Sequence, residues 1–160
     1  MREIYCIIYP LIFFAVLIPF DAHPQTESED SGYEKEEARN ELAVFLGVTT
    51  NEDATAFTFG LDYQYRISPI VGIGALVDHA AGDIKSTLVG PALLLHFRKW
   101  EFTLAPAAEF LEDETVAAVR FGLEYEIKLP KFSISPAVNV DFERSGSPAA
   151  VYGLAFSKEF

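Results

Sequence analysis

The last eleven residues of the chain alternate between bulky apolar side chains and small or charged ones. Tyr152, Leu154, Phe156 and the terminal Phe160 share one face of an extended segment, whereas residues such as Gly153 share the other. A period of two residues predicts a β-strand whose two faces meet different environments. Because the same alternation recurs in seven segments upstream, the chain is predicted to be all-β.

The strand pattern repeats as hairpins. Gly60, Gly90, Gly122 and Gly153 lie 30, 32 and 31 residues apart, each between apolar or proline neighbours, which indicates four copies of one hairpin. The eight predicted strands are 41–49, 55–66, 70–79, 87–97, 100–110, 115–127, 132–142 and 150–160. At about 3.3 Å per residue and a tilt near 45°, strands of this length span about 25 Å, the height of the lipid-facing band of a membrane barrel.

The two faces of the strands indicate lipid outside the barrel. In 55–66, one face carries bulky side chains from Phe57 to Tyr65, and the other carries Thr58, Gly60 and Asp62. An eight-stranded interior is just wide enough for ordinary side chains, so the bulky face has to point outward. We therefore predict an eight-stranded antiparallel up-and-down transmembrane β-barrel. Its last strand pairs with its first, because hydrocarbon cannot satisfy an open sheet edge. A soluble ligand-binding barrel with the same strand count is the alternative.

Two strand details stay open. Both faces of 41–49 are largely apolar, so the sequence leaves their orientation undecided. Pro91, Pro106 and Pro136 each fall in mid-strand and remove a backbone donor, which predicts bulges or bends there.

The C-terminal strand resembles that of bacterial outer-membrane proteins, in which a terminal Phe preceded by alternating hydrophobic residues is read by the assembly machinery. Tyr152, Leu154, Phe156 and Phe160 match this signal, and Lys158 departs from the usual apolar choice. Residues 41–160 are similar in length and strand number to the outer membrane protein A transmembrane domain and to outer membrane protein X. The resemblance implies the bacterial outer membrane as location, with its lipids and assembly machinery as partners, and we expect a monomer.

The first forty residues are not expected to belong to the barrel. Residues 1–25 fit a secretory signal peptide, since Ile4 to Phe20 is almost uninterrupted hydrocarbon, although an uncleaved anchor helix is the alternative. Cys6 lies inside it and is badly placed for lipidation. Residues 26–40 hold six acidic and two basic residues, which predicts a disordered linker. Residues 41–160 carry 16 acidic and nine basic residues, so nucleic acid is not an expected partner.

The predicted connections alternate in charge. The tight ones, 67–69, 98–99 and 128–131, contain four of the six basic residues found in the connections and should be periplasmic turns. The longer ones, 50–54, 80–86, 111–114 and 143–149, are mostly acidic and should face outward. Acidic pairs and triplets at Glu52-Asp53 and Glu112-Asp113-Glu114 are candidate divalent-cation contacts, although they lack the ligand spacing of a dedicated calcium loop.

The inward faces predict a polar network in the lumen. Its members are Asp62, Arg66, Glu101, Glu109, Arg120, Glu124, Glu126 and Asp141. Enclosed charges must be paired or hydrated, so we expect Arg120 to bind Glu109, Glu124 or Glu101. The predicted role is therefore a structural or interaction barrel with a polar-plugged lumen, without a catalytic, cofactor or dedicated metal site.

Two other functions remain open from the sequence. One is a narrow channel or transporter component, because acidic residues outnumber cations in the lumen. The other is a lipid-modifying enzyme, which needs a nucleophile and a base together near the lipid surface. The candidate pairs are His79 with Ser86, and His96 with Thr87 or Ser68.

Overall fold

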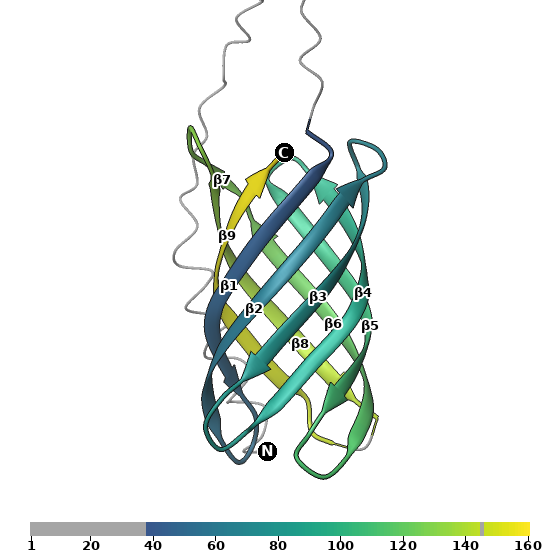
Figure 1. Ribbon diagram of the computed structural model, residues 1–160, viewed down its shortest axis with the longest axis vertical. Helices are drawn as coiled ribbons and strands as arrows, with labels where there is room; N and C mark the ends of the chain where they lie inside the picture. Colours follow the sequence, from purple (N-terminus) through teal and green to yellow (C-terminus); the bar gives the residue numbers. More distant parts are fainter. Residues whose placement is uncertain (1–37, 145) are drawn as a thin grey trace, which may run out of the picture. The chain divides into compact units, whose positions relative to one another are not determined.

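The computed structural model describes residues 38–144 and 146–160, and Arg39–Phe160 form one compact unit, an antiparallel β-barrel (Figure 1). Its strands are β1 (Asn40–Thr50), β2 (Thr55–Arg66), β3 (Val71–Ala80), β4 (Ser86–Phe97), β5 (Trp100–Phe110), β6 (Thr115–Tyr125), β7 (Ile127–Lys128), β8 (Ser133–Glu143) and β9 (Ala149–Glu159). The predicted signal peptide 1–25 and residues 26–37 of the predicted linker lie outside the described residues.

The strands form a closed ring. Successive strands pair antiparallel from β1 to β6 and from β7 to β9, β1 also pairs with β9, and β6 also pairs with β8. Both β6 and β7 pair with β8 in one continuous register, so they are two parts of one barrel strand, and the barrel has eight strands. The predicted all-β, eight-stranded antiparallel barrel is confirmed, and so is the pairing of the last strand with the first.

The predicted strand 115–127 is interrupted at Glu126. Extending the β6–β8 register places Tyr125 opposite Pro136, which has no backbone N–H to give to the ladder. On the other side of the strand the β5–β6 register continues, since the backbone N–H of Glu126 donates to the carbonyl of Lys99 at 2.7 Å. The proline on β8 therefore explains why β6 and β7 are separate.

No bulge accompanies the other two prolines. Pro91 and Pro106 lie opposite one another across β4 and β5, where pairing lapses between Val89↔Ala108 and Leu93↔Leu104. The register is the same on both sides of the gap, so neither strand contains an extra residue. The predicted bulge is therefore wrong for this pair: two facing residues without N–H groups weaken the ladder without shifting it.

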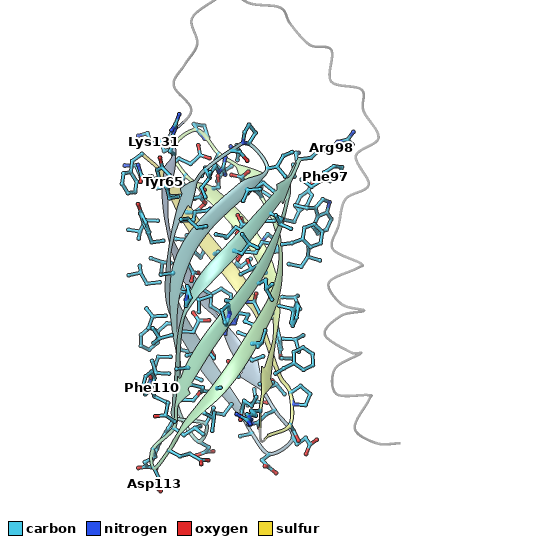
Figure 2. The ribbon with its side chains drawn as sticks, turned by 90° about the vertical axis from the view of Figure 1, so that its right-hand side faces the viewer. Tyr65, Phe97, Arg98, Phe110, Asp113 and Lys131 are labelled. Atoms are coloured by element: carbon cyan, nitrogen blue, oxygen red, sulfur yellow. The ribbon has the colours of Figure 1, made fainter. Side chains whose placement is uncertain are left out.

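The bulky face of the strands points away from the barrel axis (Figure 2). Phe57, Phe59 and Leu61 are among the exposed large hydrophobic residues, whereas the interior holds mainly small and polar side chains together with a few leucines such as Leu76. The open choice in β1 is decided in the same way: Leu42, Val44 and Leu46 face outward, and Phe45 is buried. Phe45 packs inside with Ala137, Val151 and Ala155, which are small enough to leave it room.

Linker residue Asn40 is ordered as the first residue of β1. It exchanges backbone hydrogen bonds with Phe160 at 2.9 and 3.3 Å, and its side chain accepts a hydrogen bond from the Tyr63 hydroxyl at 2.8 Å. Pairing with the C-terminal residue thus extends the barrel beyond the predicted start of its first strand.

The two ends of the barrel differ. The turns after β2, β4 and β7 lie at the end that holds the C-terminus, here called the turn end, with Arg98 and Lys131 at its rim (Figures 1 and 2). The loops after β1, β3, β5 and β8 lie at the loop end, where Asp113 is at a tip (Figure 2). Residues 38–144 and 146–160 include no helix with the length and hydropathy required of a membrane span.

Candidate functional site

A buried arginine crosses the middle of the lumen. Arg120 on β6 donates from Nε and Nη2 to the two carboxylate oxygens of Asp141 on β8, at 2.7 and 2.8 Å. It also donates from Nη1 to Asp78 on β3. Arg120, Asp78 and Asp141 are each at most 5% exposed. This trio, the Arg120 cluster, therefore joins strands from different sides of the barrel through charge-assisted hydrogen bonds.

The predicted partners of Arg120 are wrong. We expected Glu109, Glu124 or Glu101, which lie on β5 or on β6 itself, but its partners come from β8 and β3. Asp141 is directly opposite Arg120 in the β6–β8 register, so this carboxylate lies on the neighbouring strand on the other side of β6 from β5. The inward phase of Asp78 was readable in the sequence, but its position across the lumen depends on how the ring closes.

The Arg120 cluster separates two cavities. A cavity of about 160 Å³ extends toward the turn end, and another of about 220 Å³ extends toward the loop end. Asp78 and Arg120 line both, so they form the wall between them. We call these cavities the turn-end chamber and the loop-end chamber.

A network of ion pairs lies at the mouth of the turn-end chamber. Arg66 contacts Glu41 and Glu159, both at 3.3 Å. Lys128 contacts Glu159 at 3.2 Å and Glu126 at 3.6 Å, and Glu126 also accepts a hydrogen bond from Ser133 at 3.0 Å. These contacts tie together the ends of β1, β2, β7 and β9, and they use the predicted network residues Arg66 and Glu126.

Deeper in this chamber, carboxylates outnumber the positively charged side chains that contact them. Glu101 and Glu124 are directly opposite each other on β5 and β6. Glu101 contacts His96 Nδ1 at 3.2 Å and accepts a weak hydrogen bond from Gln64 at 3.4 Å. Within the described part of the chain, Asp62 and Glu124 have no side-chain hydrogen bond or ion pair. Like charges facing each other across a strand pair are unfavourable unless something neutralises them.

The loop-end chamber is also acidic. Its lining includes the carboxylates of Asp53, Asp83, Glu109, Asp141 and Glu143, and Arg120 is its only Lys or Arg among the described residues. The predicted network member Glu109 thus lies on the far side of the Arg120 cluster from Glu101 and Glu124. The predicted network is therefore distributed over two chambers.

The candidate catalytic pairs do not form. His79 Nδ1 contacts Thr87 Oγ1 at 2.9 Å, and its ring lies 5.3 Å from that of Phe59. Ser86 is buried, whereas His79 shares the phase of the outward-facing residues of β3. His96 contacts Glu101 instead of Thr87 or Ser68.

The remaining predicted site residues lie on the outside or at the rim. Leu154, Phe156 and Phe160 of the predicted assembly signal are exposed, and Tyr152 is half-buried. In the acidic loops, Glu112 forms an ion pair with Lys85 at 3.8 Å. Among residues 38–144 and 146–160, no three His, Cys, Asp or Glu side chains are grouped so as to hold a metal ion.

Comparison with known proteins identifies the fold. No family model and no curated protein matches the sequence. The N-terminal β-barrel domain of Pseudomonas aeruginosa OprF is similar in structure, with a TM-score of 0.57 and 14% identity, over 78% of this chain and 100% of that one. The Yersinia pestis outer membrane protein Ail in a phospholipid bilayer nanodisc matches with a TM-score of 0.53 and 16% identity, over 78% and 100%.

A designed barrel is also similar. One of a set of de novo designed transmembrane β-barrels matches with a TM-score of 0.51 and 14% identity, over 78% of this chain and 99% of that one. The likeness covers the barrel and extends to natural and designed proteins of this size. The chain has the fold of the small eight-stranded outer-membrane β-barrels, as its sequence resemblance implied.

Proposed function

We propose that the chain is an outer-membrane barrel with a structural or interaction role, and that the Arg120 cluster plugs its lumen. The exposed hydrophobic side chains around the strands match a lipid exterior. The single observation that carries the plug is that Arg120 binds both Asp78 and Asp141 across the axis, with a separate cavity on each side. A lumen crossed by paired side chains has no open bore.

Heat-modifiable migration tests the location and the fold. The outer-membrane fraction of cells expressing the chain is run on SDS gels with and without boiling. A folded barrel resists SDS until it is boiled, so we expect two bands of different mobility. Recovery of the chain in the periplasmic fraction without detergent would contradict the proposal and support a soluble barrel.

Planar-bilayer conductance tests the plug. The wild-type protein is expected to give no discrete conductance, because Arg120 blocks the route between the chambers. Arg120→Ala removes the side chain that forms the wall and is expected to give small conductance steps. A matched control, Arg98→Ala, changes an exposed basic residue in the β4–β5 turn and should give no discrete conductance, like the wild type.

A narrow cation path is the second candidate function. The observation in its favour is that carboxylates line both chambers on either side of Arg120. On this alternative the wild-type protein itself conducts, prefers cations to anions, and conducts more after Arg120→Ala. The wild-type trace therefore separates the two candidates.

The partners follow from the outer surface. We propose that the C-terminal strand is read by the outer-membrane assembly machinery through Tyr152, Leu154, Phe156 and Phe160, and that the barrel is a monomer. Divalent cations at the acidic loops are proposed as contacts to lipid phosphate. We propose no catalytic role, because His79 has only Thr87 as a polar partner among the described residues, and no carboxylate orients its ring.

A further inference from the structure

The β4–β5 turn holds two adjacent cations in an unusual backbone position. It consists of Arg98 and Lys99, and the residues on either side, Phe97 and Trp100, pair with each other. Arg98 has a φ of 58°, in the left-handed region that short hairpin turns usually fill with Gly or Asn. Backbone preference therefore does not account for an arginine at this position, whereas a role for its side chain does.

No carboxylate neutralises these cations in the described part of the chain. Arg98 and Lys99 are both exposed, and neither takes part in an ion pair there. The acidic residues of the ion-pair network at the chamber mouth are already held by the basic residues of that network. The charged groups of Arg98 and Lys99 instead lie 5.8 and 5.9 Å from the ring centres of Phe97 and Tyr125, within range of a cation–π contact. Their positive charge is thus available to an anion from outside the chain.

Aromatic side chains lie on the outer face directly beside the turn. Phe97 is 65% exposed and lies next to Arg98 at the rim of the barrel (Figure 2). Trp100 shares the outward phase of Phe102, and its ring meets that of Tyr125 edge to face, with 4.9 Å between the ring centres. Aromatic residues gather at the boundary between lipid acyl chains and headgroups. In a membrane, the two cations of the turn therefore lie at the depth of the headgroups.

The β4–β5 turn differs from the rest of the rim in charge. At the same end, residues 67–70 contain no charged side chain and residues 129–132 contain one, Lys131, which lies on the opposite side of the rim from Arg98 (Figure 2). The exposed charges of the loop end are mostly carboxylates, such as Asp83, Glu112 and Asp113. Attraction for an anion is therefore concentrated at the turn end, and within that end at the β4–β5 turn.

We propose that the β4–β5 turn binds the phosphate of an anionic phospholipid headgroup, with Arg98 and Lys99 donating to it above the rings of Trp100 and Tyr125. The guanidinium group matches the geometry of a phosphate, and basic residues near a membrane surface attract anionic lipids. A zwitterionic headgroup brings its own cation, which two adjacent basic side chains repel, so a lipid with net negative charge is favoured. The inference rests on the proposed membrane location, and it adds a preference for one lipid class.

Quenching of Trp100 fluorescence by brominated lipids tests the proposal on the full barrel folded into vesicles. Trp100 is the only tryptophan of the chain and directly follows the turn, so its quenching reports the lipids that lie there. The vesicles contain equal amounts of phosphatidylcholine and phosphatidylglycerol, and one of the two is brominated near the headgroup end of its acyl chains. We expect stronger quenching by brominated phosphatidylglycerol, corresponding to a relative binding constant of about fivefold or more.

Matched variants separate the turn from the net charge of the barrel. Arg98→Gln with Lys99→Gln removes both cations and should abolish the preference for phosphatidylglycerol. Lys131→Gln with Lys158→Gln removes the same charge from exposed positions elsewhere at the turn end and should leave the preference unchanged. Heat-modifiable migration confirms that each variant is folded.

The possible failures are distinguishable. Equal quenching by the two lipids in the wild type would overturn the inference without contradicting the lipid-facing barrel, and would indicate a soluble anion as the partner of the turn. Loss of the preference in the variant of Lys131 and Lys158 would also overturn it, because net charge would then select the lipid. Quenching by neither lipid would contradict both the inference and the proposed membrane location.

Discussion

Gly60 lies directly opposite Asp78 in the β2–β3 pair, and a Cβ atom built on Gly60 would meet the Asp78 carboxylate. Asp78 is one of the two carboxylates that hold Arg120. The glycine therefore leaves the space in which the Asp78 side chain lies against the strand wall. Gly60 is one of the four glycines that recur with the hairpin period, and the packing of Asp78 explains why a glycine occupies this position.

Gly60→Ala is expected to displace Asp78 and break its contact with Arg120. Disrupting a buried ion pair lowers the free energy of unfolding by about 3–5 kcal/mol. Urea unfolding in lipid vesicles, followed by Trp100 fluorescence, measures the loss. Gly72→Ala is the matched control, since a Cβ there meets His96 Nε2 at 3.2 Å and every other atom at 3.5 Å or more. Equal stability of the Gly60 variant and the wild type would show that Asp78 moves without cost.

Removing Arg120 alone should be worse than removing the whole cluster. Arg120→Met leaves Asp78 and Asp141 buried without a cation, and we expect a loss of about 3–5 kcal/mol in unfolding free energy. Adding Asp78→Asn and Asp141→Asn removes the stranded charges and should recover part of that loss. The same urea assay measures the coupling free energy between Arg120 and the two aspartates. A triple variant less stable than Arg120→Met would contradict the charge-balance explanation.

The facing prolines predict a stabilising double substitution. Pro91→Val with Pro106→Val supplies two backbone donors where the β4–β5 ladder lapses. Because a net hydrogen bond contributes about 0.5–1.5 kcal/mol, we expect the unfolding free energy to rise by about 1 kcal/mol or more. Pro69→Val in the β2–β3 turn, outside any strand, is the control and should not stabilise the barrel. A less stable double variant would mean that the prolines relieve crowding at this seam.

A charge on the outer face should cost more at mid-barrel than at the rim. Leu61 lies in the middle of β2 between Val44 and Val77, and Ile70 is in the β2–β3 turn. Leu61→Arg is expected to lower the free energy of unfolding in vesicles by about 2–4 kcal/mol, and Ile70→Arg by about 0–1 kcal/mol. Equal effects at the two positions would argue against a lipid-facing belt.

Much of the barrel was readable from the chain because strand faces alternate with a fixed period of two. Phe59, Phe102 and Phe121 face outward as their phase predicts, and the predicted short turns and longer loops lie at opposite ends of the barrel. Where both faces of a strand are apolar, as in β1, the alternation does not indicate which face points into the lumen. There the choice depended on the neighbours: Phe45 enters the lumen because Ala137 and Ala155 leave space for it.

The sequence by itself determined the number of strands and, for every strand except β1, which side chains point inward, since both depend only on local periodicity. Only the tertiary structure decided which inward residues meet. Arg120 meets Asp141 through the β6–β8 register and Asp78 across the axis, and Pro91 faces Pro106 through the β4–β5 register. Register and ring closure are relations between segments far apart in the chain, and a pattern within one strand carries no information about them.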